Sequence, residues 1–415
     1  MSHPLVQPFA ALRPSPNYAS DVVAPPYDVL NTEEARALAE GKPWSFLHIS
    51  KPEIDLPAGK SPYDEAVYSK GAENINRMIE AGVLVRDPVP AYYVYRVQMG
   101  EHIQTGIVGA GSVQAYEKNL IRRHELTRPD KETDRFKQIL AVNAQTGPVF
   151  TTHQPDPDLS GVTKEVMLGT PEYSVIGEGG VRHTLWMVSD VARMARITAG
   201  FDRLGVIYIA DGHHRSAAAS RVAAERHAKN PDHTGDEPYN SFLIVSFPKP
   251  EVQVLDYNRV VKDLNGLSVA DLILRLGGSF AVEKSADPVK PDAVRTFGMY
   301  VQGQWYSLIY TGGLPDPANP TADLDVSVLT TAVLSPILGI EDPRTESRID
   351  FVGGIRGMAE LEKRVNSGDW AVAFSLYPTS VDQLIAVADA EEIMPPKTTW
   401  FEPKLADGMV SLMLD

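Results

Sequence analysis

A short apolar run followed by an alanine-rich stretch lies near the middle of the chain. Residues 206–210 are apolar and rich in β-branched side chains, which predicts a buried strand. Residues 216–229 are rich in Ala, which predicts a helix. The segment between them, here called the DGHHR turn, consists of Asp211, Gly212, His213, His214 and Arg215. The pattern therefore predicts a strand–turn–helix unit with its polar groups concentrated at the junction.

Each side chain of the DGHHR turn is suited to a binding site. Asp211 offers a carboxylate, Gly212 permits a close backbone approach, and Arg215 offers a planar fork for phosphate or carboxylate. The two histidines can titrate or bind a metal, and a structural role beneath the helix is an equal alternative. Because a strand leads through Gly into a helix N-terminus, the unit is also suited to bind an anion.

Apolar and alternating segments predict helices and strands along the rest of the chain. Before the DGHHR turn, we expect helices at residues 64–81 and 130–144 and strands at residues 91–99, 102–108 and 148–153. After it, we expect a helix at residues 268–276, a hairpin at residues 297–310, an apolar helix at residues 324–338 and a strand at residues 371–377. This mixture predicts an α+β (mixed α/β) fold.

The chain has 415 residues, which is too long for one ordinary domain. Pro248-Lys249-Pro250 is the boundary that we favour, since it follows a predicted buried strand. We expect a catalytic region at residues 1–248, an α+β lobe at residues 249–393 and a tail at residues 394–415 that docks back on the catalytic region. The tail is aromatic and stiffened by prolines, so Lys397 and Thr398 could supply anion contacts; a terminal strand is the alternative.

Charge and composition exclude several classes of protein. The formal net charge is −15, which opposes nonspecific binding to nucleic acid or to an anionic membrane. The absence of Cys excludes disulfides and thiolate metal sites. The sequence has no apolar run long enough to span a bilayer and no charged-then-apolar N-terminal segment, so we expect a cytoplasmic protein.

A basic segment interrupts this acidic chain ahead of the helix predicted at residues 130–144. Its cations are Lys118, Arg122, Arg123, Arg128, Lys131, Arg135 and Lys137, and acidic residues are interspersed among them. A solvated helix with intrahelical ion pairs would explain this composition. The break at Thr127-Arg128-Pro129-Asp130 instead divides the cations between a loop and a helix start. That layout favours a polyphosphate ligand.

A proline pair near the N-terminus holds two further candidates. In the segment Pro25-Pro26-Tyr27-Asp28, the prolines stiffen the backbone and hold Tyr27 and Asp28 at a fixed place. Asp28 therefore becomes a candidate for the site, although a turn or a helix cap would explain it equally well.

The polar segments together carry the groups that a kinase requires. A kinase uses a carboxylate to orient or deprotonate the acceptor hydroxyl, acid and phosphate oxygens to hold Mg²⁺, and cations to spread the charge of the moving phosphoryl group. Asp211 and Glu125 are the carboxylates that we favour. A zinc hydrolase with ligands from His124, His213 and His214 is the competing interpretation, but adjacent histidines seldom converge on one metal and the chain has no His-Glu-x-x-His motif.

Motifs spread over nearly the whole chain resemble those of the bacterial and archaeal family DUF1015. They are residues 24–29, His124-Glu125 with Thr127, Lys131 and Asp134-Arg135, the DGHHR turn, and residues 394–399 with 401–404. The DGHHR turn after an apolar strand also resembles the signature of the free serine kinases of the ParB/sulfiredoxin-like superfamily. In ParB-type and sulfiredoxin proteins, a Gly-containing box ending in Arg at the same junction binds nucleotide phosphates.

This resemblance implies a ParB/sulfiredoxin-like nucleotide-binding core with an additional C-terminal lobe, which transfers a phosphoryl group from ATP (or ADP) to free L-serine with Mg²⁺. The residues implied in nucleotide and phosphate binding are Gly212, His213, His214, Arg215, His124, Thr127, Lys131, Arg135, Lys397 and Thr398. Those implied in substrate binding are Tyr27, Asp28 and Arg123. Asp211 and Glu125 would be catalytic and would hold Mg²⁺. A ParB-like nucleotide-binding regulator without kinase activity is the alternative.

Overall fold

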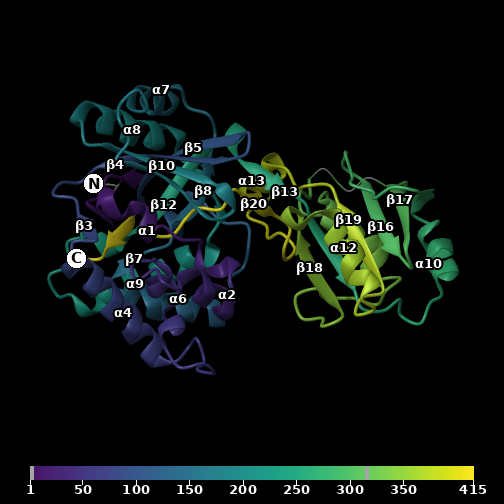
Figure 1. Cartoon of the computed structure of the whole chain (residues 1–415). Helices are drawn as coiled ribbons and strands as arrows, with labels where there is room; N and C mark the ends of the chain where they lie inside the picture. Colours follow the sequence, from purple (N-terminus) through teal and green to yellow (C-terminus); the bar gives the residue numbers. More distant parts are fainter. Residues whose placement is uncertain (1–3, 314–315, 317) are drawn as a thin grey trace. The chain divides into compact units, whose positions relative to one another are not determined.

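The structure, a computed structural model, describes residues 4–313, 316 and 318–415 and divides into two units (Figure 1). Unit 1 comprises the chain up to Val252 together with Pro403–Asp415, and unit 2 comprises Gln253–Glu402. Both units contain helices and sheets, which confirms the predicted mixed α/β class.

The observed ends of unit 2 can be compared with the expected domain boundaries. The expected boundary at residue 248 lies shortly before the observed one at residue 252. The expected tail is itself divided, because residues 394–402 belong to unit 2 and residues 403–415 to unit 1.

The main sheet of unit 1 is mixed and carries the DGHHR turn at the end of one strand. Its spatial order is β6 (Ile121–Arg122), β11 (Ile207–Asp211), β8 (Val149–His153), β12 (Ser241–Pro248), β5 (His102–Ser112), β4 (Tyr92–Met99), β10 (Arg182–Val188) and β9 (Tyr173–Ile176), and β1 (Val6–Gln7) pairs with β5. β11 is parallel to β6 and antiparallel to β8. The apolar run predicted as a strand is thus a buried strand near one edge of the sheet.

Helices cover both faces of this sheet, with α7 and α8 on one face and α4, α6 and α9 on the other (Figure 1). The helices of unit 1 are α1 (Ala19–Val22), α2 (Thr32–Ala39), α3 (Leu47–Ser50), α4 (Glu65–Glu80), α5 (Val113–Glu117), α6 (Pro129–Val142), α7 (Pro157–Val166), α8 (Val191–Leu204) and α9 (His213–Lys229). Short 3₁₀ segments are Pro16–Tyr18, Tyr27–Val29, Pro52–Asp55, Glu178–Gly180, Pro238–Asn240 and Lys249–Glu251. None of the helices in the described part of the chain is long and apolar enough to cross a membrane.

A small sheet in unit 1 joins segments that are distant in the sequence. Its order is β3 (Leu84–Arg86), β2 (Ala11–Pro14), β21 (Ser411–Met413) and β7 (Ala144–Gln145). Because β21 lies between β2 and β7, the last residues of the chain are held inside unit 1. An apolar core that includes Leu12, Phe46, Met78 and Val142 lies beside this sheet.

Unit 2 has its own sheet and its own core. Its antiparallel sheet has the order β15 (Phe280–Ser285), β17 (Gln304–Tyr310), β16 (Thr296–Val301), β19 (Val372–Leu376), β14 (Tyr257–Val261) and β18 (Ile349–Gly353), while β13 (Gln253–Leu255) pairs with β20 (Trp400–Glu402). Its helices are α10 (Val269–Leu276), α11 (Asp325–Leu329), α12 (Gly357–Asn366) and α13 (Val381–Asp389). α12 packs on the sheet through Leu361 and Val365.

The structure corrects the prediction of one apolar helix over residues 324–338. The α-helical part ends at Leu329, and residues 330–334 form a wider π-helical turn. The hydroxyl of Thr330 donates to the Val326 carbonyl at 2.8 Å, and that of Thr331 donates to the Ser327 carbonyl at 3.0 Å. Such bonds compete with the regular helical pattern, which a hydrophobicity pattern does not reveal.

Candidate active site

The DGHHR turn depends on a glycine at its second position. Gly212 has a φ of 104°, a conformation that L side chains rarely adopt. A Cβ added there would lie 3.3 Å from the Cα of Val149, so β8 also approaches the turn closely. α9 begins directly afterwards at His213, earlier than the expected start at residue 216, because the left-handed glycine already turns the chain into the helix.

Asp211 is the last residue of β11 and is held by a cation from the C-terminal segment. Lys404 Nζ donates to Asp211 Oδ2 at 3.1 Å, and about a third of the Asp211 side chain is exposed. Desolvation opposes ionisation here, but the charges of Lys404 and Arg215 outweigh it and hold the pKa of Asp211 well below its usual value. The carboxylate is therefore anionic throughout the physiological range.

Two buried imidazoles lie beside the turn. The rings of His124 and His213 meet edge to face at 4.5 Å, and the backbone N–H of His124 donates to His213 Nε2 at 3.4 Å. The neutral His213 ring thus carries its hydrogen on Nδ1, which lies 3.6 Å from Glu125 Oε2. Burial lowers the pKa of His124 to about 4 and holds that of His213 well below its usual value, so both rings are neutral at pH 7.

One ring nitrogen of His124 lacks a partner. His124 is almost fully buried, and its ring bonds to the backbone of Ile209 through one nitrogen. The other nitrogen, Nδ1, has no hydrogen-bond partner among the described residues. A buried polar atom without a partner is costly, so this nitrogen is a candidate contact for a ligand.

Arg215 connects the DGHHR turn to the proline-stiffened N-terminal segment. Its Nη2 donates to Asp28 Oδ2 at 3.3 Å, and its Nη1 donates to the Pro148 carbonyl. Its guanidinium lies 5.9 Å from the ring of Tyr27, and that of Arg135 stacks on the same ring at 3.9 Å. The structure thus brings Tyr27, Asp28, Arg135 and Arg215 together.

A carboxylate from the C-terminal segment completes this group. Asp407 is buried, and the backbone N–H of Tyr27 donates to it. Burial raises the pKa of Asp407 to about 7, although the charges of Arg215 and Arg135 oppose the shift. Its Oδ1 lacks a hydrogen-bond partner within the described ranges.

These residues surround a small cavity, here called the acid–arginine cavity. Its walls are Tyr27, Ser50, Arg135, Gln138, Ile139, Gln145, Thr146, Gly147, Arg215 and Asp407. Its volume is about 30 Å³. Arg215 belongs both to this cavity and to the DGHHR turn, and its charge also acts on Asp211.

Other predicted residues have different surroundings. Thr127 donates to Glu132 at 2.7 Å, and Lys131 donates to the hydroxyl of Tyr63 at 2.7 Å. His214 Nε2 accepts from the backbone N–H of Arg128 at 3.0 Å, which ties α9 to the start of α6. The guanidinium of Arg123 stacks on Tyr116 at 5.7 Å, and its charge acts on His213.

Lys397 and Thr398 belong to unit 2, whereas the other candidates belong to unit 1. Arg259, which is fully buried, donates to the Lys397 carbonyl at 2.9 Å, and Thr398 donates to the Pro395 carbonyl at 2.6 Å. These contacts lie within unit 2.

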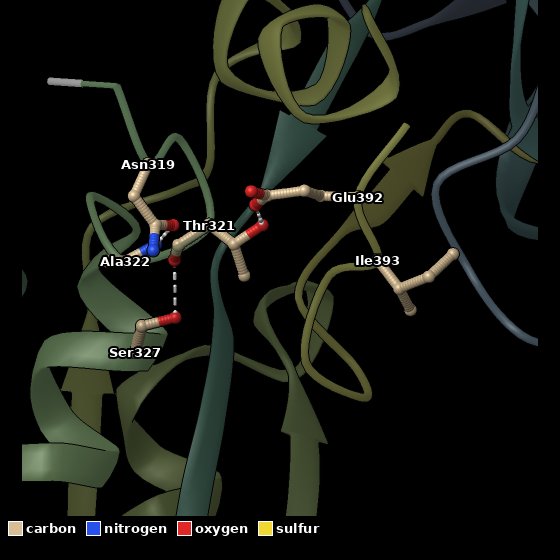
Figure 2. A pocket seen from close by; sticks show the side chains of 6 residues that line it. All are labelled: Asn319, Thr321, Ala322, Ser327, Glu392 and Ile393. Carbon is tan, nitrogen blue, oxygen red and sulfur yellow. Dashed lines mark hydrogen bonds between the residues drawn. The ribbon is translucent and has the colours of Figure 1, made fainter. Parts of the chain in front are cut away.

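A second cavity lies in unit 2 (Figure 2). Its lining residues are Asn319, Thr321, Ala322, Ser327, Glu392 and Ile393. The Thr321 hydroxyl donates to the Glu392 carboxylate, and the Ser327 hydroxyl donates to the Thr321 carbonyl at 2.7 Å. Among the described residues, this lining includes one carboxylate and no cation, so these residues lack the positive charge that binds a phosphate group.

Sequence reasoning missed Lys404 and Asp407 as site residues. Both lie in the C-terminal segment, whose aromatic and proline-rich character had marked it as a segment that docks. The aromatic and proline-rich composition indicated that the segment docks, but the residues that it suggested as anion contacts were Lys397 and Thr398.

The chain belongs to the family described as "Protein of unknown function (DUF1015)", which matches residues 6–327. This match confirms the resemblance drawn from the sequence motifs. No curated protein matches the chain.

Solved structures show distant similarity. One is a free serine kinase in complex with AMP, at a TM-score of 0.34 and 11% identity, covering 71% of this chain and 86% of that chain. Another is SbnI with a C-terminal truncation from Staphylococcus aureus, at a TM-score of 0.39 and 10% identity, covering 74% and 87%. A conserved hypothetical protein from Pyrococcus furiosus has a TM-score of 0.32 and 13% identity, covering 73% and 93%.

Proposed function

We propose that this protein is a cytoplasmic kinase that transfers the terminal phosphoryl group of ATP to the hydroxyl group of free L-serine. The observation that carries the proposal is the Asp211 carboxylate, kept ionised by Lys404 and Arg215 at the N-terminus of α9. A carboxylate, two cations and a helix N-terminus at one place are the groups that phosphoryl transfer requires. The choice of serine follows from the resemblance of the DGHHR turn.

The low pKa of Asp211 separates its role from that of Glu125. A strongly ionised carboxylate is a weak proton acceptor but a good partner for a hydroxyl hydrogen or a cation. We therefore assign Asp211 to orienting the serine hydroxyl or holding Mg²⁺. Glu125, whose side chain is 40% exposed and lies beside the Nδ1 hydrogen of His213, is assigned to accept the hydroxyl proton.

The proposed step balances as follows. The serine oxygen forms a bond to the γ-phosphorus while the bond from that phosphorus to the β–γ bridging oxygen breaks. ADP leaves with the electron pair of that bond, and the hydroxyl proton passes to Glu125. Arg215 and the N-terminus of α9 offset the negative charge on the phosphoryl oxygens.

Mg²⁺ fits the residues present better than zinc does. Within the described chain, no group of three or more His, Cys, Asp or Glu side chains is arranged to hold a metal. Mg²⁺ is commonly held by one or two carboxylates together with phosphate oxygens and water, whereas catalytic zinc takes three protein ligands. Asp211 and Glu125 would hold Mg²⁺, which neutralises charge on the β- and γ-phosphates when bound.

The test is an assay with ATP, Mg²⁺ and a panel of amino acids, with detection of the phosphorylated product. We expect O-phosphoserine, and we expect Asp211→Asn to lower the rate by roughly 10²-fold or more because the carboxylate that positions the hydroxyl group or Mg²⁺ is lost. Asp21→Asn is the matched control, since Asp21 is an exposed residue of α1 and is remote in sequence from Asp211 and Glu125.

Absence of product with every amino acid would overturn the kinase proposal. Binding of ATP without turnover would then favour the ParB-like regulator. A salt-dependent shift of labelled DNA duplex would point the same way.

A further inference from the structure

A hydroxyl oxygen and a carboxylate oxygen in the walls of the acid–arginine cavity have unsatisfied hydrogen-bonding capacity. Ser50 Oγ and Asp407 Oδ1 are buried in its walls, and neither has a hydrogen-bond partner in the part of the chain that the structure describes. An unpaired buried oxygen costs free energy that a bound ligand would recover. The cavity is therefore built to receive hydrogen-bonding groups.

Positive charge lies opposite the acidic wall. Arg135 stacks on Tyr27 and is bonded through Nε and Nη2 to Asp134, so its guanidinium is fixed in orientation. Its side chain is largely buried, as is that of Arg215. A rigid, buried guanidinium is well suited to bind a carboxylate.

The Asp407 oxygen forms a complementary cation site. A Cβ added at Gly147 would lie 3.3 Å from Asp407 Oδ1 and 3.5 Å from Arg215 Cδ, so the backbone passes close to this oxygen and a larger residue would crowd it. Burial raises the pKa of Asp407 to about 7, so a cation bound at Oδ1 would stabilise the ionised carboxylate. The charges of Arg215, Asp28 and Arg135 act on this carboxyl, and the backbone N–H of Tyr27 donates to it.

We propose that the acid–arginine cavity is a clamp for the head group of an α-amino acid, with Arg135 binding the carboxylate and Asp407 binding the ammonium group. A volume of about 30 Å³ suits the charged end of a small molecule and excludes a nucleotide base. Because Arg215 lines the cavity and also acts on Asp211, the side chain of the bound amino acid lies toward the reacting carboxylate. The inference rests on the proposed function in taking this amino acid to be the phosphoryl acceptor.

Calorimetric titration of the full chain without nucleotide tests the clamp. The probes are L-serine, 3-hydroxypropanoate, which lacks the ammonium group, and ethanolamine, which lacks the carboxylate. We expect both analogues to bind at least ten times more weakly than L-serine. We expect Arg135→Gln and Asp407→Asn each to weaken L-serine binding by roughly ten- to a hundredfold, since each removes a charged hydrogen bond.

The pattern across probes separates a lost contact from a damaged fold. Arg135→Gln should leave the binding of ethanolamine unchanged, and Asp407→Asn should leave that of 3-hydroxypropanoate unchanged. Gly147→Ala, which fills the cavity and keeps every charge, should weaken L-serine binding, and Arg182→Gln, a change at an exposed residue of β10, should not.

No binding of L-serine to the unaltered chain would overturn the clamp, as would equal losses for all three probes in either variant. If L-serine binds with the expected pattern but is never phosphorylated, the kinase proposal fails and the clamp stands. If L-serine is phosphorylated with an unchanged KM in both variants, the clamp fails and the kinase proposal stands.

Discussion

Asp211 lies where burial and charge act in opposite directions. Desolvation alone would raise its pKa, and two cations lower it. One of them, Lys404, comes from 193 residues further along the chain. The ionisation of the candidate catalytic carboxylate thus depends on a residue of the C-terminal segment.

Lys404→Met should raise the pKa of the Asp211 carboxyl. With the ammonium group gone, desolvation is opposed by Arg215 alone among the two leading cations. We expect a shift of roughly one pH unit or more. The ¹³C chemical shift of the Asp211 carboxyl carbon against pH measures it, and Lys404→Arg, which keeps the charge, should retain the original pKa. Identical titration curves for Lys404→Met and the unaltered chain would contradict this role.

At the scale of elements, the junction of β11 and α9 is the part on which the candidate site depends. The glycine between them is the only residue type that meets both the positive φ and the close approach of β8 without strain. A substitution there must distort the strand end that carries Asp211.

Gly212→Ala should cost more stability than Gly205→Ala. Gly205 ends α8 with a φ of 69° and has open space where a Cβ would be, so its substitution costs roughly 1 kcal/mol of backbone strain. At Gly212 the strain adds to contact with Val149, and we expect roughly 2–3 kcal/mol. Urea unfolding of both variants measures the difference. Equal losses of stability in the two variants would show that β8 moves away from an added Cβ at little cost.

The elements around the DGHHR turn could be predicted because their signals are local. An apolar β-branched run gave β11, and an alanine-rich stretch gave α9. The charged break at residues 127–130 contains the start of α6 at Pro129. The fixed φ of proline suits a first helical position. The start of α9 was placed too late because the left-handed conformation of Gly212 leaves no mark in a hydrophobicity pattern.

The contribution of the C-terminal segment could not be predicted in the same way. Lys404 and Asp407 reach the site because β21 pairs between β2 and β7, and such long-range pairing has no local sequence signal. The proline-stiffened segment at residues 25–28 was recognised as a candidate because its rigidity is local, but its partner Asp407 was not.

At the scale of the whole molecule, unit 1 is assembled from both ends of the chain. Tyr27 comes from near the N-terminus, Arg135 and Arg215 from the middle, and Asp407 from near the C-terminus. The candidate site therefore exists only when unit 1 is folded, and conditions that unfold this unit also abolish the site.

Buried neutral histidines make the stability of unit 1 depend on pH. Burial lowers the pKa values of His124, His153 and His183 to about 4 each, and that of His213 also lies well below its usual value. In the unfolded chain these groups have pKa values of about 6.5, so between pH 6.5 and 4 the unfolded state binds more protons. Stability must therefore fall as the pH falls through this window. The raised pKa values of Asp407 and Glu251 act in the opposite direction and offset part of the loss.

Urea unfolding followed by circular dichroism at pH 7.5 and pH 5.0 measures this dependence. Each histidine with a folded pKa of about 4 should contribute about 2 kcal/mol of destabilisation between the two pH values. His183→Gln should lower stability at pH 7.5, because the bond of the ring to the Tyr95 hydroxyl is lost, yet should lose less on acidification. The difference between the two pH values is compared within each protein, so the general cost of the substitution cancels. A loss on acidification as large as that of the unaltered chain would show that His183 takes up its proton without unfolding.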